Sequence, residues 1–361
     1  MECPSITNLG YADFSQKIHL NANQQRIPLN ASFEVTMRCD LRCQHCYLPM
    51  EQRTGNQQGE LTLPEIQRIF AEIADAGCLW LLLTGGEPFL RKDFLQIYDA
   101  AKRQGFITTI FTNGTLITEK IADYLAEWRP FSIEISLYGA TQATYENVTG
   151  IPGSFSRCMQ GIERLVDRGL PLKLKGVLMT LTQHELHAMQ AFAKSLDLSF
   201  RFDPVINAGI DGNQHPTQFR LSPENVIEIE MKDEQRAEIF PEAIEKLLNI
   251  PIDSSKLYTC GAGRSSFHID PYGKLCLCIT ARTPGYDLRN HNFKECWDQL
   301  LPKLLNQDHS SSFVCSSCEL RTMCPQCPAM GLVEYGNPEA QVPFLCQITH
   351  LRYNNFHNQK V

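Results

Sequence analysis

The chain has 361 residues and a net charge of −7, from 33 basic and 40 acidic residues. A hydrophobic fraction of 43% and a charged fraction of 20% are those of a folded globular protein, so they exclude a disordered, collagenous or coiled-coil chain. Because the balance is acidic and no block of like charges occurs, we expect no nucleic-acid partner. The length allows one large domain and a smaller one, on a prior of roughly 150 residues per domain.

The first residues carry an acidic side chain and lack the basic start and apolar run of a secretory signal. The longest apolar run, residues 78–83, is too short to cross a bilayer. We therefore expect a cytoplasmic protein with no membrane partner. The chain contains 15 cysteines, and clustered cysteines in a reducing cytosol indicate metal ligands or redox groups more than disulfides.

Short apolar runs alternate with amphipathic stretches, which is the pattern of repeated βα units. We expect strands at residues 33–37, 79–84, 106–112, 131–137, 172–179 and 199–203. Helices are expected after the Thr62–Glu65 capping box, ending at Gly77, and at residues 94–103, 119–128, 155–168 and 184–196. Six such units predict an α/β fold with a parallel sheet, expected as a partial (β/α)6 TIM-like barrel whose active face lies at the carboxyl ends of its strands.

Three cysteines follow the first expected strand directly, in the spacing Cys39-x3-Cys43-x2-Cys46. Three thiolates can bind three irons of a [4Fe–4S] cluster, whereas a complete shell has four. The remaining iron would be open to a small molecule that chelates it through an amine and a carboxylate. Polar or glycine-rich segments also end the next strands, including Gly85-Gly86-Glu87-Pro88 after the second.

The cysteine motif with Tyr47 behind it, together with Gly85-Gly86-Glu87-Pro88, resembles the radical S-adenosylmethionine (SAM) superfamily. The resemblance implies that SAM binds the open iron and that an electron from the reduced cluster splits it into methionine and a 5′-deoxyadenosyl radical.

The resemblance also implies roles for single residues at the ends of the strands. Glu87 and the backbone of Gly85 and Gly86 would receive the methionine ammonium group, with Pro88 completing the motif. The other implied SAM contacts are Tyr47 near the adenine, Ser136 facing the ribose, Asn113 close by, and Lys175 and Arg201 as candidates for the carboxylate.

Structural readings of these residues remain open. A CxxC pair alone often binds zinc, and a lone Gly-Gly is often a turn. Glu34 and Ser136 could be ordinary exposed strand residues. His45 is expected to pack near the ligands rather than to be a fourth ligand. Cys78 and Cys158 are expected in the core.

A second group of cysteines lies in the back of the chain, in the order Cys260, Cys278, Cys315, Cys318, Cys324, Cys327 and Cys346. It resembles the seven-cysteine SPASM extension of peptide-modifying radical SAM enzymes. One difference is that two residues separate Cys324 from Cys327, where the family more often has three.

Such extensions hold two auxiliary [4Fe–4S] clusters. The resemblance implies that Cys315, Cys318, Cys324 and Cys346 close the outer cluster and that Cys260, Cys278 and Cys327 hold the inner one. Cys276, two residues from Cys278, either completes the inner shell or leaves an open iron there. A pair of zinc knuckles is the structural alternative. Asp270 is expected to cap a turn.

These observations divide the chain into an N-terminal segment at 1–31, a radical SAM partial barrel at 32–235, a linker helix at 236–254 and a SPASM domain at 255–361. We expect a radical SAM oxidoreductase that modifies an unactivated C–H of a ribosomally made peptide, by cross-linking, thioether formation or backbone excision. Its partners would be the precursor peptide and a flavodoxin- or ferredoxin-like electron donor. The leader of the precursor would be bound by a separate leader-recognition protein or directly by this chain.

Three alternatives stay open. One alternative is a formylglycine maturase acting on a sulfatase. Such an enzyme would have an aspartate after the cysteine that ends the Gly-x4-Cys block, which runs from Gly273 to Cys278 in this chain. Here Ile279 follows Cys278. A dehydrogenase of small molecules would usually have a shorter cysteine extension. A zinc or iron–sulfur interaction protein without catalysis would not cleave SAM.

Overall fold

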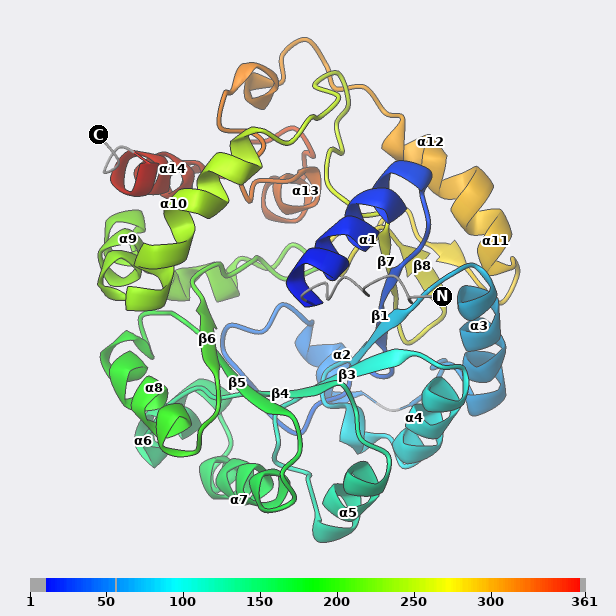
Figure 1. Cartoon of the computed structure of the whole chain (residues 1–361), viewed down its shortest axis with the longest axis vertical. Coiled ribbons are helices and arrows are strands. Elements are labelled where there is room, and N and C mark those ends of the chain that lie inside the picture. Colours follow the sequence, from blue (N-terminus) through cyan, green and yellow to red (C-terminus); the bar gives the residue numbers. More distant parts are fainter. Residues whose placement is uncertain (1–10, 56, 358–361) are drawn as a thin grey trace, which may run out of the picture.

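The computed structural model describes residues 11–55 and 57–357. A single sheet of nine strands runs through it in the order β6-β5-β4-β3-β2-β1-β7-β8-β9 (Figure 1). The strands are β1 (Asn30–Glu34), β2 (Trp80–Thr84), β3 (Ile107–Thr112), β4 (Ser132–Ser136), β5 (Leu172–Val177), β6 (Phe200–Asp203), β7 (Ser266–Ile269), β8 (Lys274–Cys276) and β9 (Tyr286–Asp287).

Strands β1 to β6 are parallel to their neighbours, as the sequence predicts, so their carboxyl ends meet at one edge. The sheet does not end with these six strands. Strand β7, from the back of the chain, pairs in parallel with β1 and carries the antiparallel strands β8 and β9. The segment with the second group of cysteines therefore starts as an extension of the barrel sheet.

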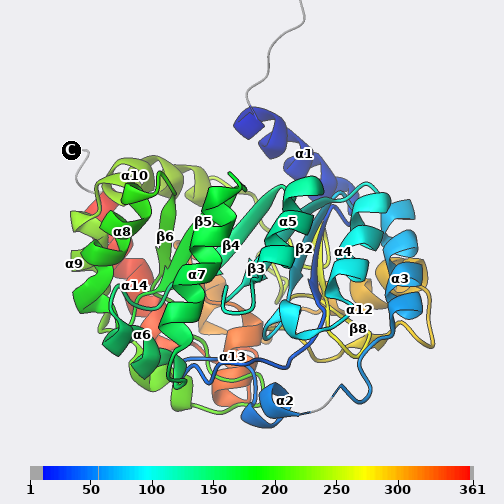
Figure 2. The ribbon, with the colours of Figure 1, turned by 90° about the horizontal axis from the view of Figure 1, so that it is seen from below.

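Helices cover the outer side of the sheet and surround the back of the chain (Figure 1). They are α1 (Tyr11–Gln25), α2 (Met50–Thr54), α3 (Leu63–Asp75), α4 (Phe94–Arg103), α5 (Glu119–Glu127), α6 (Gln142–Thr149), α7 (Ser154–Asp167), α8 (Leu186–Ser195), α9 (Pro223–Lys232), α10 (Glu234–Leu248), α11 (Phe293–Glu295), α12 (Leu301–Leu305), α13 (Pro328–Tyr335) and α14 (Pro343–Arg352). Short 3-10 or π turns lie at Pro88–Leu90, Gln183–Glu185, His215–Phe219, Cys296–Leu300, Val314–Ser317 and Tyr353–His357. Figure 2 shows α2 and α13 at one end of the molecule and α1 at the other.

Helix α3 shows how local sequence sets an element. The Thr62 side chain accepts from the Glu65 amide, the Glu65 carboxylate accepts from the Thr62 amide, and the helix ends before Gly77, whose φ is +100°. Its predicted apolar face is buried, and Phe70 packs edge-on against Phe33 of β1 with ring centroids 5.2 Å apart. The same core contains Cys78 and Cys158, which confirms the prediction that both are core thiols.

The first strand begins and ends three residues earlier than predicted. Strand β1 covers Asn30–Glu34, whereas the apolar pattern favoured 33–37. The chain beyond Glu34 still follows β2, because the Val35 amide donates to the Thr84 carbonyl over 2.9 Å. From Thr36 onward its carbonyls accept from the turn that follows β2 instead of from a strand.

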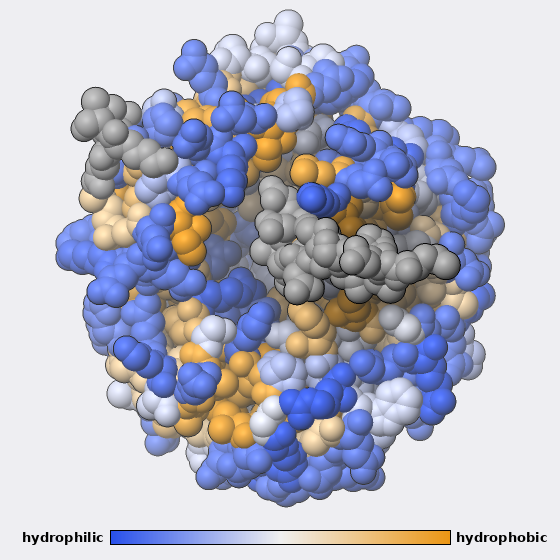
Figure 3. All heavy atoms as spheres, in the orientation of Figure 1, coloured by the Kyte–Doolittle hydropathy of each residue, from blue (hydrophilic) through white to orange (hydrophobic). Residues whose placement is uncertain are grey.

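The face shown in Figure 3 is mostly hydrophilic, with small scattered apolar areas. Two apolar side chains of α1 are exposed, Phe14 at 46% and Leu20 at 56%. None of the helices in the described ranges has the length and apolar character needed to cross a membrane.

Replacing Ile69 by alanine is expected to lower the free energy of unfolding by about 2–5 kcal/mol, because Ile69 of α3 is completely buried against the sheet. Ile239 of α10 is 51% exposed, so the matched Ile239→Ala variant should change that free energy by no more than about 0.5 kcal/mol. Urea titration followed by circular dichroism measures both. Equal losses in the two variants would contradict the packing described here.

Candidate active site

The three front cysteines lie in the loop that follows β1 and line a hollow of about 340 Å3 at the carboxyl ends of the strands. The Cys46 amide donates to the Cys43 carbonyl over 3.3 Å, and the Leu41 amide donates to the Cys39 sulfur over 3.4 Å. Burial, followed by the negative charge of Glu87, raises the pKa of the Cys39 thiol to about 12. Burial also raises the pKa of Cys43 and Cys46. Burial thus favours the neutral thiols, and a positive partner such as a metal would favour the thiolates.

The hollow brings together most of the side chains that the sequence singled out. From that set it is lined by Cys39, Cys43, Cys46, Tyr47, Gly85, Gly86, Asn113, Ser136 and Lys175. Residues of the set that do not line it are Glu87, Pro88 and Arg201. Residues the sequence did not single out also reach it, among them Leu82, Phe111, Tyr138 and Ile279.

The chemistry of the three thiols suits an iron–sulfur cluster. A [4Fe–4S] cluster binds its thiolates at different irons, so its ligands stand apart around the cube. Thiolates are also the ligands that iron–sulfur clusters select. No fourth cysteine in the described part of the chain lines this hollow, so the donor set fits a cluster with one open iron.

Gly85 and Gly86 are required where the turn after β2 crosses the segment that leads to Cys39. The Gly86 amide donates to the Thr36 carbonyl and the Glu87 amide to the Arg38 carbonyl, both over 2.8 Å. A Cβ on Gly86 would lie 2.3 Å from the Arg38 oxygen, and one on Gly85, whose φ is +156°, would lie 2.2 Å from the Thr36 oxygen. Only glycines permit this contact between two backbones.

Glu87 is fully buried, and its carboxylate holds the end of β3. It accepts from the Thr112 hydroxyl over 2.8 Å, from the Asn113 amide over 2.7 Å and from the Phe89 amide over 3.2 Å. Burial raises its pKa to about 8 in spite of these bonds. An ammonium group bound nearby would favour the charged carboxylate. Pro88 is buried and opens the short turn Pro88–Leu90.

Asn113 connects the end of β3 to the cysteine loop. Its side-chain amide donates to Asp40 over 2.8 Å and lies 3.8 Å from the Cys39 sulfur. Its side-chain oxygen accepts from the Thr115 amide over 2.9 Å, and the Thr115 hydroxyl donates to Asp40 over 2.6 Å. Asp40 and Thr115 carried no signal in the sequence beyond their nearness to the two motifs.

His45 lies between two cysteines and packs against Tyr138, with ring centroids 4.8 Å apart. Burial, followed by the charge of Arg53, lowers the pKa of His45 to about 4, so the ring is neutral near pH 7. Its Nδ1 has no hydrogen-bond partner and the ring lines the hollow.

Lys175 and Arg201 both approach Glu134, but they lie in different surroundings. The Lys175 ammonium lies 2.8 Å from the centre of the Phe111 ring and 3.6 Å from a Glu134 oxygen, and burial lowers its pKa to about 7. Arg201 donates to Glu134 over 2.7 Å and its side chain is 57% exposed. Lys175 lines the hollow, whereas Arg201 does not and is connected to Lys175 only through their shared partner Glu134.

Glu34 at the end of β1 is completely buried, so it is not the exposed strand residue that the sequence left open. It accepts a bidentate pair of hydrogen bonds from Arg282 at 2.7 and 2.8 Å and one from the Tyr47 hydroxyl at 3.1 Å. His268 of β7 lies 3.5 Å away. Burial alone would raise the pKa of Glu34, but His268 and Arg282 hold it at about 2. This ion pair joins the front cysteine loop to the loop after Cys278.

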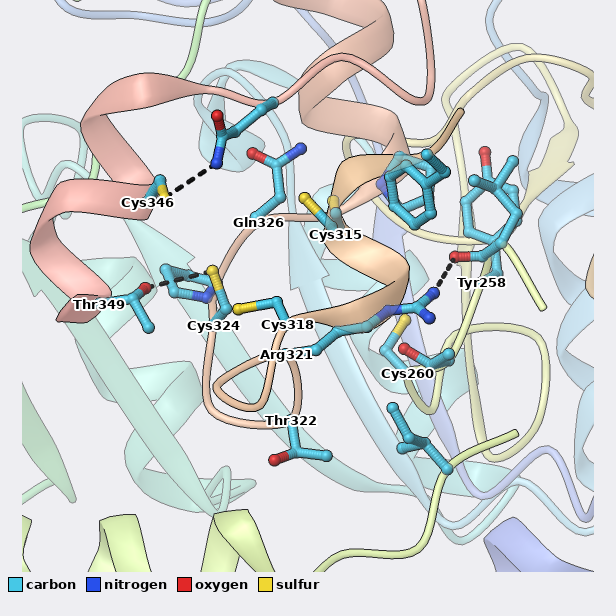
Figure 4. Close-up of a pocket in the computed structure, with 18 of the residues that line it drawn as sticks. Tyr258, Cys260, Cys315, Cys318, Arg321, Thr322, Cys324, Gln326, Cys346 and Thr349 are labelled. Carbon is cyan, nitrogen blue, oxygen red and sulfur yellow. Dashed lines mark hydrogen bonds between the residues drawn. The ribbon is translucent and has the colours of Figure 1, made fainter. Parts of the chain in front are cut away.

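Six of the seven back cysteines line a second hollow of about 580 Å3 (Figure 4). They are Cys260, Cys315, Cys318, Cys324, Cys327 and Cys346. Two polar side chains donate to thiols there: Thr349 to Cys324 over 3.2 Å and Gln341 to Cys346 over 2.9 Å (Figure 4).

Two of these thiols have other cysteines as near neighbours. Burial, followed by the charges of Cys324, Cys318 and Cys346, raises the pKa of Cys315. Burial raises the pKa of Cys327 to about 11, and the charges of Cys278 and Cys260 add to that shift. The division into an outer and an inner set of ligands stays a prediction.

Cys276 is buried away from both hollows. Its thiol donates to the carbonyl groups of Lys274 and Arg282 over 3.6 and 3.4 Å. Asp270 accepts from the amides of Tyr272 and Lys274, each over 2.9 Å, which confirms that it caps a turn.

A parallel sheet with three thiols beyond its first strand and a diglycine turn beyond its second is an arrangement suited to an iron–sulfur enzyme that uses SAM. Residues 33–193, somewhat less than half of the chain, match the Radical SAM superfamily. This match supports radical SAM chemistry, with SAM and an iron–sulfur cluster as cofactors.

Several relatives of known role show partial similarity. The chain is 26% identical over 260 residues to the antilisterial bacteriocin subtilosin biosynthesis protein AlbA of Bacillus subtilis, covering 71% of this chain but only 56% of AlbA. It is 27% identical over 314 residues to PqqA peptide cyclase of Bradyrhizobium diazoefficiens, covering 82% and 80% of the two chains. It is 24% identical over 338 residues to AdoMet-dependent heme synthase of Methanosarcina barkeri, covering 88% and 96%.

The fold is that of Streptococcus suis SuiB in its complex with the precursor peptide SuiA. The TM-score is 0.66 with 18% identity, over 94% of this chain and 82% of SuiB. This likeness shows the partial barrel with its cysteine-rich extension.

Replacing Glu34 by glutamine is expected to lower the free energy of unfolding by about 3–5 kcal/mol at pH 7, because Arg282 then stays buried without its counter-charge. The pKa of Glu34 is depressed to about 2, so the contribution of the pair is complete above pH 4.5 and is lost as the pH falls through 2. The difference in the free energy of unfolding between this variant and the unsubstituted protein should therefore be constant from about pH 5 to 7 and shrink below pH 4.5.

Urea titrations at several pH values measure this difference. Glu228→Gln is the control, because Glu228 forms an exposed ion pair with Lys232 and its loss should have no measurable effect. A Glu34→Gln variant as stable as the Glu228→Gln variant would contradict the structural role of the pair.

Proposed function

We propose that the chain cleaves SAM reductively at the front hollow and modifies an unactivated C–H of a ribosomally made peptide. The observation that carries the proposal is that three thiols, the diglycine turn and the buried Glu87 meet at one end of the sheet, and no fourth cysteine within residues 11–55 and 57–357 lines the hollow there. When bound there, the reduced cluster and SAM would supply methionine and a 5′-deoxyadenosyl radical able to remove a hydrogen atom.

The residues around the front hollow would then bind and orient SAM. Cys39, Cys43 and Cys46 would hold the cluster. The carbonyl and amide groups of Gly85 and Gly86, with Glu87 behind them, would receive the methionine ammonium. The high pKa of Glu87 supports this role, because a buried carboxyl gains most from a bound cation.

The remaining SAM contacts are proposed from the positions of the residues along the carboxyl edge of the sheet. Ser136 would face the ribose and Tyr47 the adenine side, with Asn113 holding the Cys39 loop beside them. Lys175 is the better candidate for the carboxylate of SAM, because it lines the hollow. Arg201 would act on it only through Glu134.

We further propose that the back cysteines hold two auxiliary [4Fe–4S] clusters in a SPASM domain at 255–361, joined through the linker helix at 236–254 to the barrel at 32–235. The 1–31 segment and the end of the SPASM domain extend outside the described residues. The thiols that lie near one another in the back of the chain support this proposal. Because the Cys276 thiol is engaged with two carbonyl groups, we favour an inner cluster bound by Cys260, Cys278 and Cys327 without it.

The peptide substrate is proposed from the named relatives, among which PqqA cyclase acts on a peptide and SuiB binds one. Ile279 lines the front hollow in the position where sulfatase maturases have an aspartate, which argues against formylglycine formation. The heme synthase relative makes a tetrapyrrole the second candidate substrate class. A precursor peptide, a leader-recognition protein and a flavodoxin- or ferredoxin-like donor are the partners proposed.

Changing Cys39, Cys43 and Cys46 together to alanine is expected to abolish cleavage of SAM into methionine and 5′-deoxyadenosine by the reduced, anaerobically reconstituted protein. The iron content should fall by about four atoms per chain, because one cluster loses its ligands. The matched control changes three core cysteines, Cys78, Cys158 and Cys296, to alanine and should retain both iron and cleavage. Unchanged cleavage in the first variant would refute the proposed function.

A second prediction concerns the outer auxiliary cluster. Changing Cys315, Cys318, Cys324 and Cys346 to alanine should again remove about four irons per chain. Cleavage of SAM itself should persist, because these thiols lie in the other hollow. Elemental analysis after reconstitution measures the loss. If the unsubstituted protein contains about one zinc in place of these four irons, the cysteines form zinc knuckles instead.

A further inference from the structure

Arg53 is a buried cation beside the front cysteine loop. It lies on α2, which follows that loop, and is 7% exposed. Its Nη1 donates to the Cys43 carbonyl over 3.2 Å, and its own carbonyl accepts from the Cys39 amide over 3.1 Å. These bonds hold the guanidinium group against the loop of the three thiols.

The guanidinium group has no acidic partner among the described residues. Its Nε is buried without a hydrogen-bond partner. Two other arginines with little exposure in the described ranges are paired: Arg91 donates to Asp93 over 2.7 Å, and Arg282, whose side chain is 12% exposed, donates to Glu34 over 2.7 Å. A buried charge without a counter-charge is strongly unfavourable. A fold that keeps Arg53 unpaired in this position is therefore suited to an anionic group beside it.

The charge of Arg53 acts on two of the three thiols, Cys43 and Cys46, and on the His45 ring between them. Burial raises the pKa of Cys43 and Cys46, and Arg53 opposes that shift at both. Three thiolates carry one more negative charge than the two positive charges of an oxidised [4Fe–4S] core. Uptake of one electron adds a further negative charge, which a fixed cation in a dry site stabilises.

We propose that Arg53 is the counter-charge of the thiolate-bound cluster and favours its reduction by one electron. The inference depends on the proposed function, since it requires a cluster on Cys39, Cys43 and Cys46. The electron comes from a low-potential one-electron carrier and stays on the cluster. No bond to Arg53 forms or breaks and no proton moves, because the guanidinium remains charged throughout.

Two substitutions separate charge from shape. Arg53→Lys keeps the positive charge and loses the planar fork, whereas Arg53→Gln loses both. A redox titration of the anaerobically reconstituted full chain, followed by electron paramagnetic resonance, measures the potential. The signal of the front cluster is the one that the triple alanine variant of Cys39, Cys43 and Cys46 lacks.

Arg53→Gln is expected to make reduction about tenfold less favourable, which is 59 mV for one electron. Arg53→Lys should retain most of the original potential. Arg42→Gln is the matched control in the same loop: its guanidinium donates to the carbonyls of Cys39 and Leu41 but is partly exposed, so water screens it and the shift should be smaller.

An unchanged potential in Arg53→Gln, or an equal shift in Arg53→Lys, would overturn the inference while leaving the cluster in place. If Arg53→Gln fails to load iron, loading in Arg53→Lys decides: normal loading supports the charge, and equal failure overturns it. If the unsubstituted protein gives the same paramagnetic resonance signals as the triple alanine variant, the front cluster is absent and the proposed function itself is refuted.

Discussion

The site depends on the contact between the backbone after β1 and the turn after β2. Parallel pairing brings the two strands to the same edge, and two further hydrogen bonds, from Gly86 and Glu87, continue the contact beyond the strands. The absence of a Cβ at Gly85 and Gly86 allows it. The contact places the cysteine loop beside Glu87, and Glu87 in turn fixes Asn113 at the end of β3. The front hollow is thus a consequence of sheet geometry.

The same sheet connects the front and back of the chain. Strand β7 pairs with β1, so the segment that carries Cys260 and Cys278 starts next to the strand that leads to Cys39. The buried Glu34–Arg282 pair adds a second connection near the thiols, and Tyr47 shares it. A charged pair buried at this point specifies a fixed relation between the two cysteine-rich loops more than it adds stability. If both loops hold clusters, that relation would set the distance over which electrons pass between them.

Much of the fold follows from local sequence. The alternation of apolar runs and amphipathic stretches is enough to predict the six parallel strands, and the Thr62–Glu65 box is enough to predict the start of α3. Helix α6 (Gln142–Thr149) was missed because it has only a weak apolar face, and β7 was missed because a short strand at Ser266–Ile269 is defined by its partner β1. Strand β1 was placed three residues late because its chain stays buried and extended past Glu34.

The residues of the site likewise fall into those that the sequence could predict and those that it could not. Motif spacing is enough to single out the three thiols and the diglycine turn, because a cluster and a close backbone crossing each demand specific residue types. The sequence could not indicate Arg282 and Asp40, because their partners Glu34 and Asn113 are distant in sequence. It could not indicate Arg53, because what distinguishes this residue is a buried Nε without a hydrogen-bond partner. Arg201 stays a prediction: its place on β6 suggested a ligand contact, and its side chain is 57% exposed and bound to Glu134.

We propose that Cys39, Cys43 and Cys46 hold a four-iron cluster with one iron left for SAM. This can be measured in a crystal structure of the anaerobically reconstituted chain with SAM, with diffraction recorded on both sides of the iron absorption edge. We expect four irons within reach of these three sulfurs, with the amine and carboxylate of SAM on the fourth. A single zinc there, or a fourth protein ligand closing the cluster, would contradict this proposal.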